Sequence, residues 1–277
     1  MLRRPFTEEP LSRLAVWSSK LGWFALAVGA LSIVVVRSGA FETEPALATF
    51  GAALAFAALA ILLAIAAFIS IWRQGRTGLG RAVLGFFLGL ILLCYPAYLG
   101  YRAYKLPAIY DITTDVANPP RFETLAKFRA SGMNIYHSSF AAKQRAAYPN
   151  IASLQYNVAP KTAFDAALNV ITKRKWRIAD VEPPSPARRD ATIEAVAHSL
   201  IMGFADDVLI RVTPTGTGTR VDVRSASRHA WSDFGGNAAR VQSLLDDIDD
   251  AITAAPEPRR EPEPPPAPAK RQPPAKR

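Results

Sequence analysis

Three long apolar stretches dominate the first hundred residues, at positions 17–36, 46–72 and 82–101. Each is long enough for the about 20 residues that cross a bilayer as a helix. Arginines precede the first stretch and fill the loop before the third, namely Arg3, Arg4, Arg13, Arg73, Arg76 and Arg81. The loop after the first stretch has only Arg37 against Glu42 and Glu44. The positive-inside rule therefore predicts a bacterial inner-membrane protein with a cytoplasmic N-terminus and a periplasmic C-terminal domain.

Small residues recur within the three apolar stretches and predict close packing of the helices on one another. They are Gly22, Ala25, Gly29, Gly51, Ala55, Gly85 and Gly89. The stretches contain no central acidic residue or histidine. Because ion and proton pathways depend on such groups, a transporter is disfavoured.

The rest of the chain changes its pattern twice. Residues 105–152 contain many helix breakers and predict an extended connector with a short helix, between an anchor at 1–104 and a soluble domain at 153–255. Alternating or helical spacing then predicts strands at 153–156, 176–181, 192–198, 208–214 and 220–227, and helices at 160–173 and 237–254. This order predicts an α+β domain with an antiparallel sheet and helices on one face. Residues 256–277 are proline-rich and predict a disordered tail.

The net charge of +10 suggests nucleic acid at first sight. Much of that charge flanks the apolar stretches or lies in the tail, so we expect the lipid bilayer as partner and no nucleic acid. Cys94 is the single cysteine and lies within the third apolar stretch, so no intramolecular disulfide can form.

Polar residues are densest between positions 204 and 240. Nine of them form a set that we call the polar edge: Asp206, Asp207, Arg224, Ser225, Ser227, Arg228, Asp233, Asn237 and Arg240. Pairing of the two strands that carry most of them would bring them within reach of one another at one edge of the sheet. We expect five of them, Asp206, Asp207, Arg224, Arg228 and Asp233, to form one connected network. We expect Arg211 to lie on an outward face in mid-strand.

Two interpretations of the polar edge compete. The favoured one is structural bracing or ligand binding without catalysis, because Arg–Asp pairs hold loops in many domains. The alternative is an envelope hydrolase in which Asp206, Asp207 and His229 supply acid–base chemistry while Arg224 and Arg228 hold an anionic substrate. His137, His198 and His229 lie far apart in the sequence, so we expect no metal site and no cofactor.

Parts of the polar edge resemble the signature of a known family. The strings are Phe204-Ala-Asp206-Asp207-Val208, Arg224-Ser-Ala-Ser-Arg228, and Ser232-Asp233 with Asn237 and Arg240. Residues 111–115 and 119–122 resemble the lead-in seen in alphaproteobacterial, membrane-anchored members. Over residues 106–254 the chain thus resembles the DUF1499 family, found in bacterial envelope proteins and some plastid ones. It departs from the family at His229-Ala230, where an apolar residue and a glycine are usual.

The resemblance implies no activity, because none is established for the DUF1499 family. Our leading hypothesis is therefore a non-enzymatic inner-membrane protein that presents a periplasmic α+β module to an unknown envelope protein or ligand.

Overall fold

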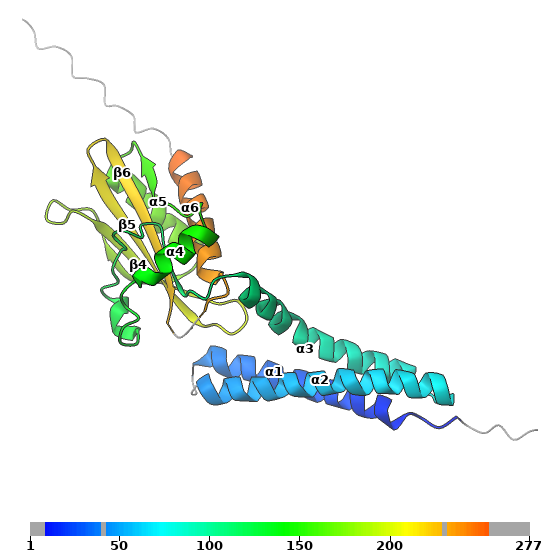
Figure 1. The fold of residues 1–277 in the computed structure, drawn as a ribbon. Coiled ribbons are helices and arrows are strands. Elements are labelled where there is room, and N and C mark those ends of the chain that lie inside the picture. Colours follow the sequence, from blue (N-terminus) through cyan, green and yellow to red (C-terminus); the bar gives the residue numbers. More distant parts are fainter. Residues whose placement is uncertain (1–8, 40–42, 229–231, 255–277) are drawn as a thin grey trace, which may run out of the picture.

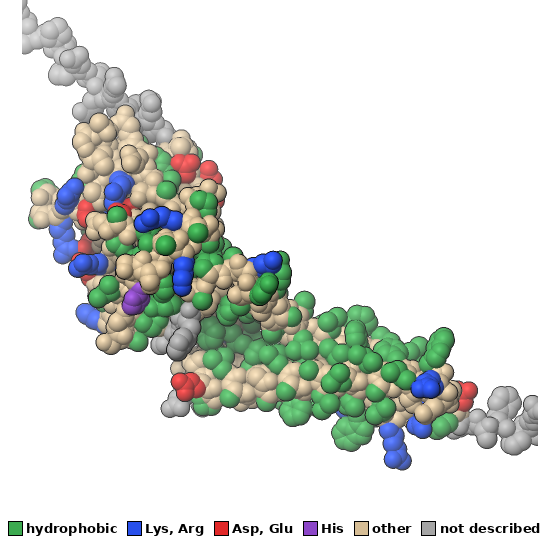
Figure 2. Space-filling view, in the orientation of Figure 1, with side chains coloured by type: hydrophobic (Ala, Val, Ile, Leu, Met, Phe, Trp, Pro, Cys, Tyr) green, Lys and Arg blue, Asp and Glu red, His purple; other side chains and the backbone are tan. Residues whose placement is uncertain are grey.

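The computed structural model describes residues 9–39, 43–228 and 232–254, and the expected tail and His229 lie outside these ranges. Three helices form the N-terminal bundle: α1 (Arg13–Ser38), α2 (Thr43–Gln74) and α3 (Leu79–Lys105). All three are long and apolar enough to cross a membrane, as predicted. Figure 2 shows apolar side chains over the outside of the bundle and Lys and Arg at the end remote from the folded domain. That exterior suits a lipid environment.

Small residues hold the three helices together. A Cβ on Gly85 would lie 2.6 Å from the Ser18 carbonyl carbon, and one on Gly89 would lie 2.7 Å from the Ala57 carbonyl oxygen. The prediction of close packing is confirmed at these glycines. It is wrong for Gly51 and Ala55, which are exposed. The buried face of α2 is instead lined by alanines at helical spacing, Ala53, Ala57, Ala60, Ala64 and Ala67.

The folded domain is α+β, as predicted, and its core is a six-stranded antiparallel sheet in the order β1-β6-β5-β4-β3, with β2 also pairing with β6. The strands are β1 (Asp111–Thr113), β2 (Leu154–Tyr156), β3 (Arg177–Glu182), β4 (Ala191–His198), β5 (Ala205–Thr215) and β6 (Gly218–Ser227). The helices are η1 (Leu125–Phe128), α4 (Ser138–Ala147), α5 (Pro160–Lys173) and α6 (Gly236–Thr253).

Helices α5 and α6 cover one face of the sheet (Figure 1). Alternate residues of β5 and β6 point to this face, including Ile210 and Val223, and both are fully buried. Ile171 of α5 and Ile248 of α6 pack on them in the same apolar cluster. This layer is the main hydrophobic core.

The opposite face of the sheet is also covered, by residues 111–137, which lie within the segment that was expected to be an extended connector. Strand β1 at the start of the segment pairs with β6, and Phe122 and Leu125 pack on Leu209 of β5. We call residues 111–137 the strap. Because the strap shields this face, both faces of the two central strands are buried.

Among the described residues, the domain contacts the bundle at the ends of α1 and α3. At the start of α6, Gly235 has φ +77°, and a Cβ there would lie 2.7 Å from both Arg102 and Leu106 at the end of α3. At the end of α1, Arg37 Nη1 donates to the backbone oxygens of Leu200 (2.8 Å) and Ile201 (3.1 Å), in the loop between β4 and β5. The domain is therefore seated on the ends of α1 and α3.

Candidate functional site

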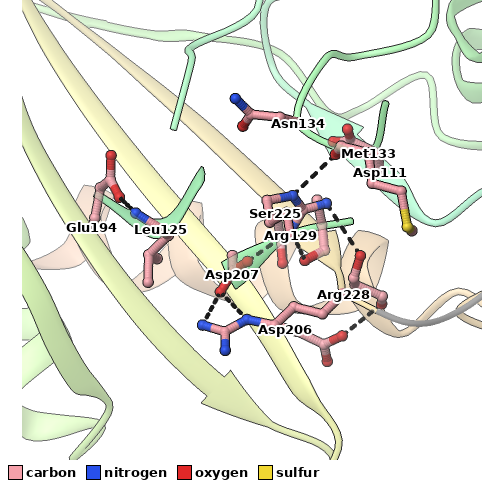
Figure 3. A network of polar contacts seen from close by, with 12 residues as sticks. Asp111, Leu125, Arg129, Met133, Asn134, Glu194, Asp206, Asp207, Ser225 and Arg228 are labelled. Carbon is pink, nitrogen blue, oxygen red and sulfur yellow. Dashed lines mark hydrogen bonds and ion pairs between the residues drawn. The ribbon is translucent and has the colours of Figure 1, made fainter. Parts of the chain in front are cut away.

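The sheet divides the polar edge between its two faces. Asp206 and Asp207 are neighbours in β5, and successive side chains of a strand point in opposite directions. Asp206 therefore lies under α6, whereas Asp207 lies under the strap (Figure 3). The side chains form separate clusters on the two faces instead of the one network expected from the sequence.

The cluster under α6 joins five side chains by short hydrogen bonds. Asp206 accepts from Ser227 Oγ and from Arg240 Nη2, each at 2.5 Å. Asn237 accepts from Ser225 Oγ at 2.7 Å and from Arg240 Nη1 at 2.5 Å, and its Nδ2 donates to Ser227 Oγ at 3.0 Å. Every one of these five side chains has a partner within the cluster, which fastens α6 to the end of β6.

Asp233 has a separate role at the N-terminus of α6. Its carboxylate accepts from the backbone nitrogens of Gly235 (2.8 Å) and Asn237 (2.7 Å), which the first turn of a helix leaves unpaired. Burial raises the pKa of the Asp233 carboxyl above its ordinary value, although these two backbone hydrogen bonds oppose the shift. Asp233 therefore satisfies backbone nitrogens at the start of α6, whose N-cap position is Gly235.

The first cluster under the strap centres on Asp207, whose side chain is fully buried. Arg129 Nη1 donates to Asp207 Oδ2 at 2.7 Å, and Arg228 donates to Oδ1 through Nε (2.9 Å) and Nη2 (2.7 Å). Arg129 also donates to the backbone oxygens of Ala226 and Ser227 in β6. One carboxylate is thus shared by an arginine of the strap and an arginine that follows β6.

The second cluster under the strap is the pair of Arg224 and Asp111, which are 1% and 0% exposed. Arg224 forks onto the carboxylate through Nε (3.0 Å) and Nη2 (2.7 Å). Its Nη1 donates to the backbone oxygen of Pro120 at 2.6 Å. The guanidinium carbon of Arg224 lies 4.9 Å from the ring centre of Phe122, and that of Arg129 lies 5.1 Å from it. Charge-assisted and cation–π contacts therefore converge on the strap.

The position of Arg211 differs from the one expected from the sequence. Arg211 was expected to lie on an outward face, but the strap covers it, and it donates to Asp222 (2.7 Å) and Asp115 (3.2 Å). Arg220 donates to the same two carboxylates. The pKa of the Asp115 carboxyl is lower than its ordinary value. Burial alone would raise this pKa, but hydrogen bonds from Asn118 and Ala117 and the charges of Arg220 and Arg211 outweigh the effect of burial.

Most of the charged side chains described under the strap belong to ion pairs. Four carboxylates, those of Asp111, Asp115, Asp207 and Asp222, pair with five guanidinium groups, those of Arg129, Arg211, Arg220, Arg224 and Arg228. Glu194 lacks an arginine, but its oxygens accept from the backbone nitrogens of Glu123 (2.5 Å) and Leu125 (2.7 Å) at the start of η1. These contacts satisfy the buried charges with other groups of the same chain, as bracing requires.

Two open hollows lie at the other end of the sheet. One, of about 460 Å³, is lined by residues that include Arg189, Arg211 and Arg220; the other, of about 610 Å³, is lined by residues that include Gln155 and Thr217. No member of the polar edge lines either hollow.

Comparison with known proteins identifies the folded domain. The family model described as "Protein of unknown function (DUF1499)" matches residues 111–248. Residues 111–248 are a DUF1499 domain. No curated protein matches the chain. Among solved structures, the chain is similar to CalU16 from Micromonospora echinospora at 16% identity, covering 37% of this chain and 74% of that one, with a TM-score of 0.26. At that level the likeness says nothing about binding or activity.

The matched range begins with β1 and includes the whole strap, so the strap is part of the DUF1499 domain. Several residues that brace it were not singled out from the sequence: Arg129, Glu194, Asp222 and Asp115 as ion-pairing or capping groups, and Asp111 as the partner of Arg224. For Asp111 and Asp115 a signal existed, because both lie in the lead-in that resembles the family. Arg129 carries no such signal.

The histidines of the described chain are not gathered in one place. His137 precedes α4 and its ring contacts Tyr110 and Phe140, whereas His198 ends β4. Within the described residues, no group of three or more His, Cys, Asp or Glu side chains could hold a metal ion. His229, the base of the hydrolase hypothesis, lies outside the described residues.

Proposed function

We propose that this chain is a non-enzymatic inner-membrane protein whose DUF1499 domain serves as a braced binding or structural module on the periplasmic side of the cell envelope. The observation that carries the proposal is that the charged side chains of the polar edge are already bonded to other side chains. Asp206, Asp207, Arg224, Arg228 and Arg240 each bond to another side chain of the chain. A catalytic centre needs groups that converge on a space for substrate.

The assignment of the domain to the periplasmic side is based on the uneven distribution of charge between the two ends of the helix bundle. Arg73, Arg76 and Arg81 lie at the adjoining ends of α2 and α3 and in the turn between them, whereas Arg37 at the end of α1 is accompanied by Glu44 at the start of α2. Three crossings then put the DUF1499 domain on the side opposite to the arginine-rich loop.

Reporter fusions test the compartment. An alkaline phosphatase fused after Ala254 is expected to be active in cells, and a fluorescent protein that matures only in the cytoplasm is expected to be dark at the same position. The same pair fused after Arg76 is the control and should give the opposite signals. A dark phosphatase and a bright fluorescent protein after Ala254 would place the domain in the cytoplasm and refute the periplasmic assignment.

A substitution at Arg228 tests bracing against ligand holding. The Arg228 side chain is 12% exposed, so a ligand could reach it more easily than Arg224. If it braces, Arg228→Ala lowers the melting temperature of the purified protein, because Asp207 loses half of its cationic partners. The control is Arg189→Ala, an exposed residue outside the polar edge.

Cells that lack the protein and carry each variant provide the second readout, through sensitivity to detergents and bulky antibiotics. Under the proposal, any envelope defect of Arg228→Ala accompanies its loss of stability. A variant that melts like the unmodified protein yet fails to restore the envelope would favour the alternative, in which Arg228 holds an anionic substrate or ligand.

A further inference from the structure

The loop that joins β4 to β5 presents apolar side chains away from the domain. Its sequence is Ser199-Leu-Ile-Met-Gly-Phe204. Leu200 is 86% exposed and Phe204 is 39% exposed, so the described protein leaves most of Leu200 uncovered. We call residues 199–204 the apolar loop.

Hydrogen bonds at its base give the apolar loop a defined shape. The Ser199 nitrogen donates to the Phe204 oxygen at 2.9 Å, and the Phe204 nitrogen donates to Ser199 Oγ at 2.9 Å. Gly203, with φ +73°, donates to the Ser199 oxygen at 3.1 Å. These bonds satisfy backbone groups across the base of the loop, so the apolar side chains project from a closed turn.

The end of α1 fixes where the apolar loop lies relative to a bilayer. Arg37 is in the last turn of α1, just after the apolar residues that would cross the membrane. Its guanidinium donates to the backbone oxygens of Leu200 and Ile201, and its Cγ lies 3.1 Å from where a Cβ on Gly203 would be. The point at which α1 leaves the hydrocarbon is therefore also the position of the loop.

Helix α3 supplies a second marker for the same leaflet. Because α2 reverses the direction of the chain, α1 and α3 end on the same side of a bilayer. The last turns of α3 expose Tyr98, Tyr101 and Tyr104. Tyrosines are enriched at the boundary between lipid and water. The domain contacts the ends of both helices, so its apolar loop faces this boundary.

We propose that the apolar loop inserts the side chains of Leu200 and Phe204 into the headgroup layer of the leaflet in which α1 ends. The occupant of the exposed apolar surface is thus the bilayer that holds the three helices. Arg37 positions the loop through its backbone oxygens, so the side chains remain free to enter lipid. The proposal holds whichever side of the membrane the domain occupies.

Site-specific fluorescence of the full-length protein in lipid nanodiscs tests the proposal. Cys94→Ser provides a background without thiols, and Leu200→Cys then carries an environment-sensitive probe. The matched control is Thr217→Cys, an exposed residue in the turn between β5 and β6, at the opposite end of the same strand. Each probe is measured with lipids spin-labelled near the headgroup and with aqueous iodide.

The expected result is blue-shifted emission at position 200, strong quenching by the labelled lipid and weak quenching by iodide, with the reverse at position 217. Equal quenching by iodide at both positions, without lipid quenching, would overturn the proposal. A blue shift at position 200 that the labelled lipid does not quench would also overturn it, and would assign the loop to a protein partner. Adding Arg37→Ala should reduce lipid quenching at position 200, because the loop loses its attachment to α1.

Discussion

The ion pair between Arg224 and Asp111 gives the sharpest test of bracing, because both side chains are almost wholly buried and each serves the other. Replacing Arg224 by Ala leaves the Asp111 carboxylate without its cation in a site closed to water. Breaking a buried pair by removing one partner costs about 3–5 kcal/mol. Loss of the contact with Phe122 adds about 0.5–2 kcal/mol on the cation–π scale. We expect Arg224→Ala to lower the free energy of unfolding by at least about 3.5 kcal/mol, the sum of the lower ends of these two ranges.

The mechanism predicts a second result that a simple loss of packing does not. If the cost comes from the stranded carboxylate, removing Asp111 as well should restore part of it. The double variant Arg224→Met with Asp111→Leu replaces the pair with apolar side chains, and such replacements are often neutral or stabilising. We therefore expect the double variant to be more stable than Arg224→Ala. With the single variants Arg224→Met and Asp111→Leu added, a double-mutant cycle gives the coupling free energy of the pair.

Urea unfolding of the full-length protein in nanodiscs, followed by near-UV circular dichroism, supplies the free energies. The slope of free energy against urea must stay constant for the comparison to hold. Arg189→Ala is the control and should stay within about 0.5 kcal/mol of the unmodified protein, because surface substitutions commonly do. An Arg224→Ala midpoint equal to that of Arg189→Ala would refute the buried-pair reasoning.

Three further outcomes follow from other parts of the structure. Arg211→Ala should destabilise the domain about as strongly as Arg224→Ala in the same urea assay, since Arg211 is buried against Asp222 and Asp115; a midpoint like that of Arg189→Ala would contradict this. The pKa of Asp115 is lowered in the fold, so its ionised form stabilises the fold at pH values above the unfolded pKa of about 3.9, and this stability is lost as pH falls through the folded pKa. Asp115→Asn should therefore lower the free energy of unfolding more at pH 7 than below pH 4. A loss of stability that does not depend on pH would count against the charge contribution. Gly85→Leu should loosen the helix bundle, because the new side chain would collide with the Ser18 backbone, whereas Gly100 has open space around it and Gly100→Leu should not. Resistance to protease in detergent distinguishes the two variants. Equal resistance would argue against the close approach of α1 and α3.

The elements predicted most accurately from the sequence are those whose own pattern determines which face is buried. Phe164 and Ile171 at helical spacing predicted α5, and the alternation of Val221 and Val223 predicted β6. Each of these elements packs one apolar stripe on the core, so local periodicity is sufficient information.

The strap could not be predicted in this way. Strand β1 has three residues, and it exists because it pairs with β6, more than a hundred positions later in the chain. Asp111 and Thr113 are polar yet buried, whereas the hydrophobic pattern of a sequence leads one to expect polar residues at exposed positions. Nothing local distinguishes such a segment from an extended connector, because its partners are supplied by the assembled sheet.

The division of the polar edge between the two faces of the sheet could be predicted in part from the sequence. Asp206 and Asp207 are consecutive in a strand, so the two-residue period by itself places their side chains on opposite faces. The two aspartates were nevertheless expected to belong to a single network. The identity of the partners, Arg240 for Asp206 and Arg129 for Asp207, depends on the packing of α6 and the strap and could not be read locally.

The chemistry under the strap suggests why charges are used there at all. An apolar segment lying on an apolar sheet could shift its register at little cost, because hydrophobic contact is not directional. A shift of the strap would instead separate Arg224 from Asp111 and Arg129 from Asp207, leaving buried charges without partners. The strap begins shortly after the end of α3 at Lys105, so fixing its register also fixes where the last helix of the bundle enters the domain. We infer that the buried pairs contribute less to total stability than to one defined seating of the DUF1499 domain on its helices.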